Sequence, residues 1–93
     1  MRKNIKQALD LLGAEYCEKF IDLERCVYRD FGNGYDIEIS GLDNKKRNPK
    51  VTIYLWCKKE QAEIVKSVSD VAIGDMRAEI EKLHEWTKGR CAF

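Results

Sequence analysis

The sequence predicts an α+β domain in which two helices lie on one face of an antiparallel meander of three to four strands. Three observations predict this fold: an apolar stripe with helical spacing near the start of the chain, alternating strand-like segments in the middle, and a second helical stripe near the end. With 93 residues and one proline, the chain has the length of a single domain, 1–93, and no stretch typical of a linker.

The first helix is expected over residues 4–24. Apolar residues recur there at steps of three or four, which places them along one helical face: Ile5, Leu9, Leu12, Tyr16, Phe20 and Leu23. Asn4 is expected to cap the start of this helix. Because a glycine inside a helix costs about 1 kcal/mol relative to alanine, a break at Gly13 is the alternative.

The middle of the chain is predicted to form strands over residues 26–31, 35–40 and 51–56. Asn33-Gly34 favours a tight type I′ turn between the first two strands, and a polar loop over residues 41–50 leads to the third. Strand alternation then turns one set of side chains toward the helices: Tyr35, Ile37, Ile39, Val51, Ile53 and Leu55.

Two interpretations are open after the third strand. The favoured one places a fourth strand near residues 64–68, because residues 64–71 include four β-branched apolar residues and two serines. A helix then begins at about Gly74, with Asp75 as its cap and the apolar stripe Met76, Ile80, Leu83 and either Trp86 or Thr87. The alternative is one long helix over residues 59–88. Residues 90–93 are expected to form a frayed tail.

The leading candidate site is the sheet face turned away from the helices. Strand alternation places two acidic and two aromatic side chains side by side there, and a third aromatic residue joins them from the first strand: Asp36, Glu38, Tyr54, Trp56 and Tyr28. Large aromatic side chains with acidic neighbours are typical of protein interfaces, so we expect these five to be partner-binding residues. In the alternative, the loop after Trp56 or the termini cover the rings, which then belong to the core.

A basic loop is the second candidate site. Four positive charges fall within six residues: Lys45, Lys46, Arg47 and Lys50. Together with Arg2, Lys3 and Lys6 they could contact a phosphate backbone. The near-neutral balance of 17 basic and 16 acidic residues argues against nucleic acid, because phosphate neutralisation supplies most of that affinity. A solvated loop is the simpler interpretation.

We expect no enzymatic activity, no metal site and no cofactor. His84 is the only histidine and is expected at the surface of a salt-bridged helix. The four cysteines, at positions 17, 26, 57 and 91, lack the close pairing that zinc needs and are expected to be free thiols. The first residues lack the apolar stretch of a signal peptide, and no run approaches the ~20 apolar residues of a membrane span. We therefore expect a cytoplasmic protein without membrane contact.

These features predict a small non-enzymatic interaction protein that binds a macromolecular partner or a second copy of itself, as a homodimer, through the aromatic sheet face. In format, as a short, near-neutral α+β chain without a catalytic set, it resembles phage and mobile-element proteins that inhibit host machinery, anti-CRISPR proteins included. The alternative is a nucleic-acid-binding module that uses the basic loop and the N-terminal lysines.

Overall fold

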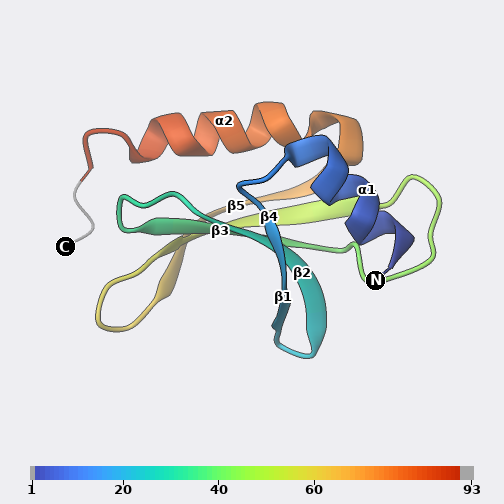
Figure 1. Ribbon diagram of the computed structural model, residues 1–93. Coiled ribbons are helices and arrows are strands. Elements are labelled where there is room, and N and C mark those ends of the chain that lie inside the picture. Colours follow the sequence, from blue (N-terminus) through green and yellow to red (C-terminus); the bar gives the residue numbers. More distant parts are fainter. Residues whose placement is uncertain (1, 91–93) are drawn as a thin grey trace.

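The computed structural model describes residues 2–90. Helix α1 (Lys3–Leu12) is followed by five strands, and helix α2 (Met76–Thr87) ends the fold. The strands are β1 (Cys17–Ile21), β2 (Glu24–Asp30), β3 (Tyr35–Ser40), β4 (Lys50–Cys57) and β5 (Glu63–Ala72). They form one antiparallel sheet in chain order (Figure 1). The predicted α+β fold is confirmed, with five strands in place of three to four.

Both helices lie on the same side of the sheet, and the core fills the space between these two layers (Figure 1). All six strand side chains predicted to face the helices are buried: Tyr35, Ile37, Ile39, Val51, Ile53 and Leu55. The helix α2 contributes its predicted stripe of Met76, Ile80, Leu83 and Thr87, which is buried as well. Asp75 ends a single 3-10 turn and occupies the N-cap position of α2, as predicted, but its side chain makes no capping hydrogen bond.

The helix predicted over residues 4–24 ends at Leu12, and the prediction is wrong beyond that residue. The chain leaves the helix at Gly13, whose φ of 103° lies in a region that favours glycine. The remaining residues form β1 and its hairpin with β2. Phe20 and Leu23, which fit the helical stripe by spacing, are 63% and 89% exposed.

The connection between β1 and β2 explains why the sequence pattern misled. It consists of Asp22 and Leu23, with φ of 51° and 66°. Positive φ at both positions is what a two-residue type I′ hairpin turn requires, and Asn-Gly or Asp-Gly is its usual sequence. Leucine rarely adopts this conformation, so this turn carries almost no sequence signal.

The hairpin predicted at Asn33-Gly34 is present, but its turn is longer than expected. Four residues, 31–34, connect β2 to β3, and positive φ falls on Gly32 and Gly34, not on Asn33. The side chain of Asn33 accepts a hydrogen bond from the backbone N–H of Tyr35 at 3.2 Å. It also donates one of 2.9 Å to Oγ1 of Thr87, which ties this loop to α2.

The favoured interpretation of the region after Trp56 is confirmed, because β5 pairs with β4 along most of its length. The single long helix over residues 59–88 is therefore wrong. The strand is longer than the predicted 64–68, and its pairing shifts between Val51 and Ile53, opposite Asp70 with its φ of 59°. Of the predicted tail, residues 91–93 lie outside the described part of the chain.

Candidate functional site

The sheet face opposite the helices brings together all five residues predicted to bind a partner. The strand register places Glu38 directly between Tyr28 on β2 and Tyr54 on β4. It also sets Asp36 beside Trp56. Neither helix lies over this group, because both pack on the other side of the sheet (Figure 1).

The two carboxylates lie beneath the aromatic rings. Asp36 and Glu38 were expected on an exposed face, but they are only 8% and 7% exposed, whereas the rings of this face are partly exposed. The hydroxyl of Tyr28 donates a 2.7 Å hydrogen bond to Oδ2 of Asp36. The indole N–H of Trp56 donates one of 3.0 Å to Oε1 of Glu38. The rings therefore form the accessible part of the face, and the carboxylates hold them in place.

This face is hollowed. The β1–β2 hairpin and the end of the β4–β5 hairpin both curve away from the helices, so they flank the open side of the sheet (Figure 1). Between them lies a shallow hollow of about 230 Å³, with Tyr28, Asp36, Glu38 and Trp56 in its lining, joined by Lys19, Ile21 and Ala62. Sequence reasoning missed Lys19 and Ile21 because β1 was assigned to the first helix, and it missed Ala62 because this residue lies in the connection between β4 and β5.

A cation of the chain itself already rests in this hollow. The ammonium of Lys19 lies 4.1 Å from the centre of the Tyr28 ring, a cation–π distance. No ion pair within residues 2–90 joins Lys19 to a carboxylate, and none joins a base to Asp36 or Glu38. We call the set Lys19, Ile21, Tyr28, Asp36, Glu38, Trp56 and Ala62 the acidic–aromatic hollow.

Burial and nearby negative charge keep the Cys26 thiol and the Tyr28 hydroxyl in their protonated forms. Burial, helped by the carboxylates of Glu24 and Glu38, raises the pKa of the Cys26 thiol to about 12. Burial and the hydrogen bond to Asp36 raise the pKa of Tyr28 well above its usual value. At neutral pH, Cys26 and Tyr28 therefore act as hydrogen-bond donors.

The second candidate site lies between α1 and the loop that joins β3 to β4. This hollow of about 1100 Å³ is lined by six basic residues, one acidic residue and four polar residues: Arg2, Lys3, Lys6, Lys45, Lys46, Arg47, Asp10, Asn4, Gln7, Asn44 and Asn48. The N-terminal cations thus lie beside the basic loop, as the nucleic-acid alternative requires. Lys50 does not line the hollow, because it already belongs to β4. We call this site the basic groove.

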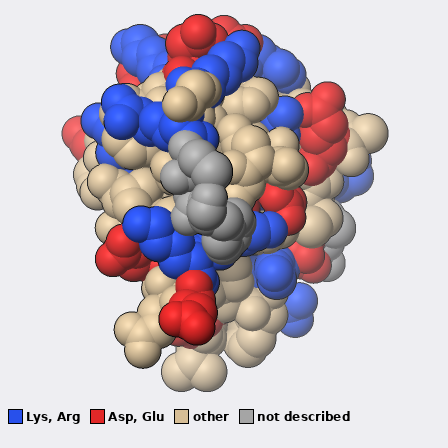
Figure 2. Space-filling model, turned by 90° about the vertical axis from the view of Figure 1, so that its left-hand side faces the viewer, with Lys and Arg blue, Asp and Glu red and all other residues tan. Residues whose placement is uncertain are grey.

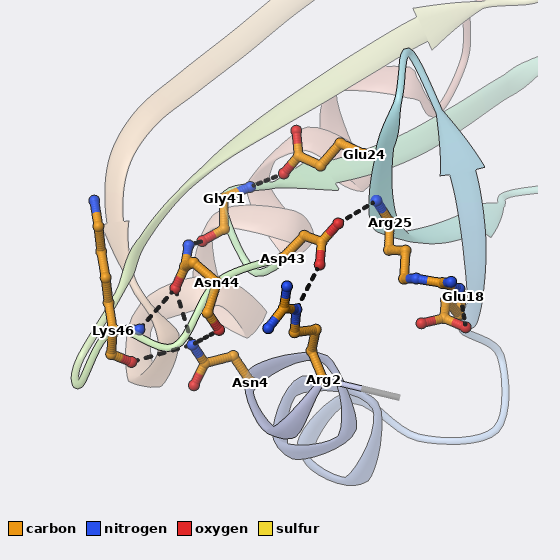
Figure 3. A network of polar contacts seen from close by, with 9 residues as sticks. All are labelled: Arg2, Asn4, Glu18, Glu24, Arg25, Gly41, Asp43, Asn44 and Lys46. Atoms are coloured by element: carbon orange, nitrogen blue, oxygen red, sulfur yellow. Dashed lines mark hydrogen bonds and ion pairs between the residues drawn. The ribbon is translucent and has the colours of Figure 1, made fainter.

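A polar network fixes the two walls of the basic groove to each other (Figure 3). The amide nitrogen of Asn4 donates to the backbone oxygen of Asn44 at 3.0 Å and to that of Lys46 at 3.1 Å. Asn4 is not the helix cap that was predicted, because α1 begins one residue earlier, at Lys3. The side chain of Asn4 points instead to the loop between β3 and β4. Arg2 adds a 3.0 Å ion pair to Asp43, which also accepts the backbone N–H of Arg25.

Charge is segregated between the ends of the molecule. The basic groove contains six of the 17 basic residues and only one of the 16 acidic residues. By contrast, Figure 2 shows the left-hand end of Figure 1, on the side toward which α2 runs, and there the blue and red side chains alternate. A near-neutral chain therefore carries one strongly positive surface.

His84 is partly exposed on α2, which carries the ion pairs Lys82–Glu79 and Lys88–Glu85, but its own ring packs against an aromatic neighbour. Its ring stacks on that of Phe31, with centroids 4.2 Å apart and an interplanar angle of 14°. Burial, together with the nearby positive charge of Arg29, lowers the pKa of His84 from its ordinary value. Across residues 2–90, no group of three or more His, Cys, Asp and Glu side chains is arranged to hold a metal ion.

Comparison of the chain with protein-family models, with curated proteins and with solved structures found no match. In the described part of the chain, both helices are too short or too polar to cross a membrane. The geometry of the two hollows is thus the basis for a functional proposal.

Proposed function

We propose that this protein is a non-enzymatic binding module that contacts another protein through the sheet face opposite its helices. The observation that carries the proposal is the arrangement of Tyr28, Tyr54 and Trp56, whose rings lie partly exposed on β2 and β4, the two strands that flank β3. Buried carboxylates beneath them fix two of the rings by hydrogen bonds. Rigid aromatic side chains lose little entropy on binding, which is why they are frequent anchors of protein interfaces.

The test compares a variant of this face with a matched variant elsewhere. Sedimentation velocity at micromolar concentration first separates self-association from binding to a different protein. Affinity capture is then performed with the wild-type chain, with the Tyr54→Ala and Trp56→Ala double variant, and with the exposed Lys82→Ala variant on α2. A captured protein is identified by mass spectrometry, and its binding is measured again with both partners purified.

We expect the double variant to remain folded by circular dichroism and to lose binding by at least about tenfold, while Lys82→Ala binds like the wild type. Equal binding by all three chains, with the double variant folded, excludes this face as the interface. A wild-type dimer that the double variant converts to a monomer would identify the partner as a second copy. Inhibition of a host machine, as in the phage and mobile-element proteins of similar format, stays a prediction from the sequence.

The basic groove supports a second candidate function, binding to a nucleic-acid backbone. Lys3, Lys45 and Arg47 line the groove, are exposed and take part in no ion pair within residues 2–90. Free cations on a fixed backbone are suited to contacting consecutive phosphates without reading the bases.

Salt dependence tests this second function. Duplex affinity is measured by fluorescence anisotropy between ~50 and ~200 mM salt, where a backbone contact releases about 0.9 counterions per neutralised phosphate. For the Lys45→Ala, Lys46→Ala and Arg47→Ala triple variant, we expect weaker binding and a salt slope lower by about three. Affinity that is independent of salt, or unchanged in the triple variant, contradicts the proposal.

A further inference from the structure

We infer that the acidic–aromatic hollow receives a basic side chain, such as an arginine guanidinium, from the partner protein. This inference rests on the proposed function and specifies the chemistry of the partner.

Neither Asp36 nor Glu38 forms an ion pair within residues 2–90. The charge of Lys58 acts on Asp36, but the ion pair of Lys58 is with Asp30. Asp36 and Glu38 are more than nine-tenths buried, yet their hydrogen-bond donors are the neutral groups of Tyr28, Trp56 and Cys26. Buried carboxylates are normally paired with a positive group, because removing a charge from water is costly. A cation delivered to the hollow would lie close to both carboxylates and would provide this compensation.

Asp36 has an acceptor atom that the described residues leave unused. Oδ2 of Asp36 accepts the Tyr28 hydroxyl, but Oδ1 is enclosed and has no donor among residues 2–90. The ammonium of Lys19 rests on the neighbouring Tyr28 ring, which shows where a cation is attracted. Since Lys19 is an exposed side chain on the edge strand β1, an incoming cation can displace it from the hollow that Asp36 lines.

The hollow is small. Small-molecule sites usually enclose about 300–1,000 Å³, and this hollow has about 230 Å³. A single long side chain suits such a volume better than a larger ligand does. Arginine matches it in chemistry, because its planar guanidinium stacks on aromatic rings and offers five donors to carboxylates.

The test uses the intact chain and a small probe, so it does not depend on finding the partner. The indole N–H resonance of Trp56 is followed by ¹H–¹⁵N NMR, and a Trp86→Phe variant distinguishes it from that of Trp86. The chain is titrated with Nα-acetyl-arginine amide and, separately, with the neutral isostere Nα-acetyl-citrulline amide. We expect the arginine probe to shift the Trp56 resonance saturably and the citrulline probe to bind at least about tenfold more weakly.

Variants of the chain show which residues bind the arginine probe. Asp36→Asn keeps the size and the acceptor for Tyr28 but removes the charge, so we expect at least about tenfold weaker binding of the arginine probe. Glu38→Gln serves the same purpose if the first variant does not fold. Glu81→Gln removes an exposed charge from α2, on the other side of the sheet, and should bind like the wild type. Lys19→Met should bind equally or more tightly, because the competing ammonium is gone.

Three results would overturn the inference. The first is no saturable shift with the arginine probe, and the second is equal binding of the citrulline probe. The third is that Lys19→Met no longer binds the arginine probe while the wild-type chain binds Nα-acetyl-aspartate amide. The last result would show that Lys19 recognises an acidic group. If the arginine probe fails while protein capture depends on Tyr54 and Trp56, the inference falls and the proposed function stands. If both fail, the face is not an interface.

Discussion

The indole N–H of Trp56 donates a 3.0 Å hydrogen bond to Oε1 of Glu38, a side chain that is 7% exposed. This bond crosses from β4 to β3 and fixes one of the partly exposed rings of this face. Trp56→Phe keeps an aromatic ring and removes the donor, so a buried carboxylate oxygen loses its partner. We expect the free energy of unfolding in urea to fall by about 1–3 kcal/mol. An equal loss in Trp86→Phe would show that the hydrogen bond is not the cause.

The three described cysteines should react at different rates with iodoacetamide. Cys17 is exposed, whereas Cys26 and Cys57 are buried. In a Cys91→Ser background at neutral pH, Cys17 should be labelled first, and the other two only on the timescale of unfolding. Burial and nearby carboxylates raise the pKa of Cys26 to about 12, so its thiolate is scarce. Labelling of Cys26 as fast as Cys17, mapped by peptide mass spectrometry, would contradict the buried position.

His84 should make the fold sensitive to mild acid. Its pKa in the folded chain lies below the ordinary value of about 6.5, so the unfolded chain binds the proton more readily. The stability that the folded chain has with His84 neutral is complete above pH ~6.5 and is lost as the pH falls below that value. We expect the urea midpoint to decrease from pH ~7.5 to ~5, and less so in His84→Phe, which retains a ring to stack on Phe31. If the urea midpoints of the wild type and of His84→Phe change with pH in parallel, His84 is not the cause of the acid sensitivity.

Asn4 should be required for the shape of the basic groove. Its amide nitrogen donates to Asn44 and Lys46 on the opposite wall, and the residue is 7% exposed. Asn4→Ala leaves acceptors of the loop without their donor, and we expect a loss of about 1–3 kcal/mol in unfolding free energy. Gln7→Ala, an exposed groove residue on the same helix, should change stability by less than about 0.5 kcal/mol. Similar losses in both variants would mean that the network adds little.

Gly41 should not tolerate a side chain. Its φ is 103°, and a Cβ atom would lie 2.8 Å from the backbone oxygen of Lys50, at the point where the chain leaves β3. Gly41→Ala should therefore destabilise the protein by more than about 1 kcal/mol in chemical denaturation. Gly74→Ala is the matched control, because that position has open space and no positive φ. If Gly41→Ala is as stable as this control, the close approach is not rigid.

The strands from Tyr35 to Trp56 and the helix α2 could be predicted because their periodic patterns continue into the core. Alternation identified the side chains of β3 and β4 that face the helices, although Asp36 and Glu38 on the other face of β3 are buried as well. Steps of three and four identified the buried side chains of α2. The same alternation placed Tyr28, Asp36, Glu38, Tyr54 and Trp56 on one face. These assignments depend on nearest neighbours along an element, which a single sequence contains.

Only the tertiary structure decided the secondary structure of residues 13–24 and which side chains line the two hollows. The stripe from Ile5 to Leu23 fits a helix, but a turn with positive φ at Asp22 and Leu23 creates β1, which brings Lys19 over Tyr28. Asp36 and Glu38 are buried where rings from the neighbouring strands contact them, and the basic groove depends on contacts such as Asn4 with Asn44, forty residues apart. Local pattern determines the faces of each element, whereas burial and charge grouping arise from contacts between segments distant in the chain.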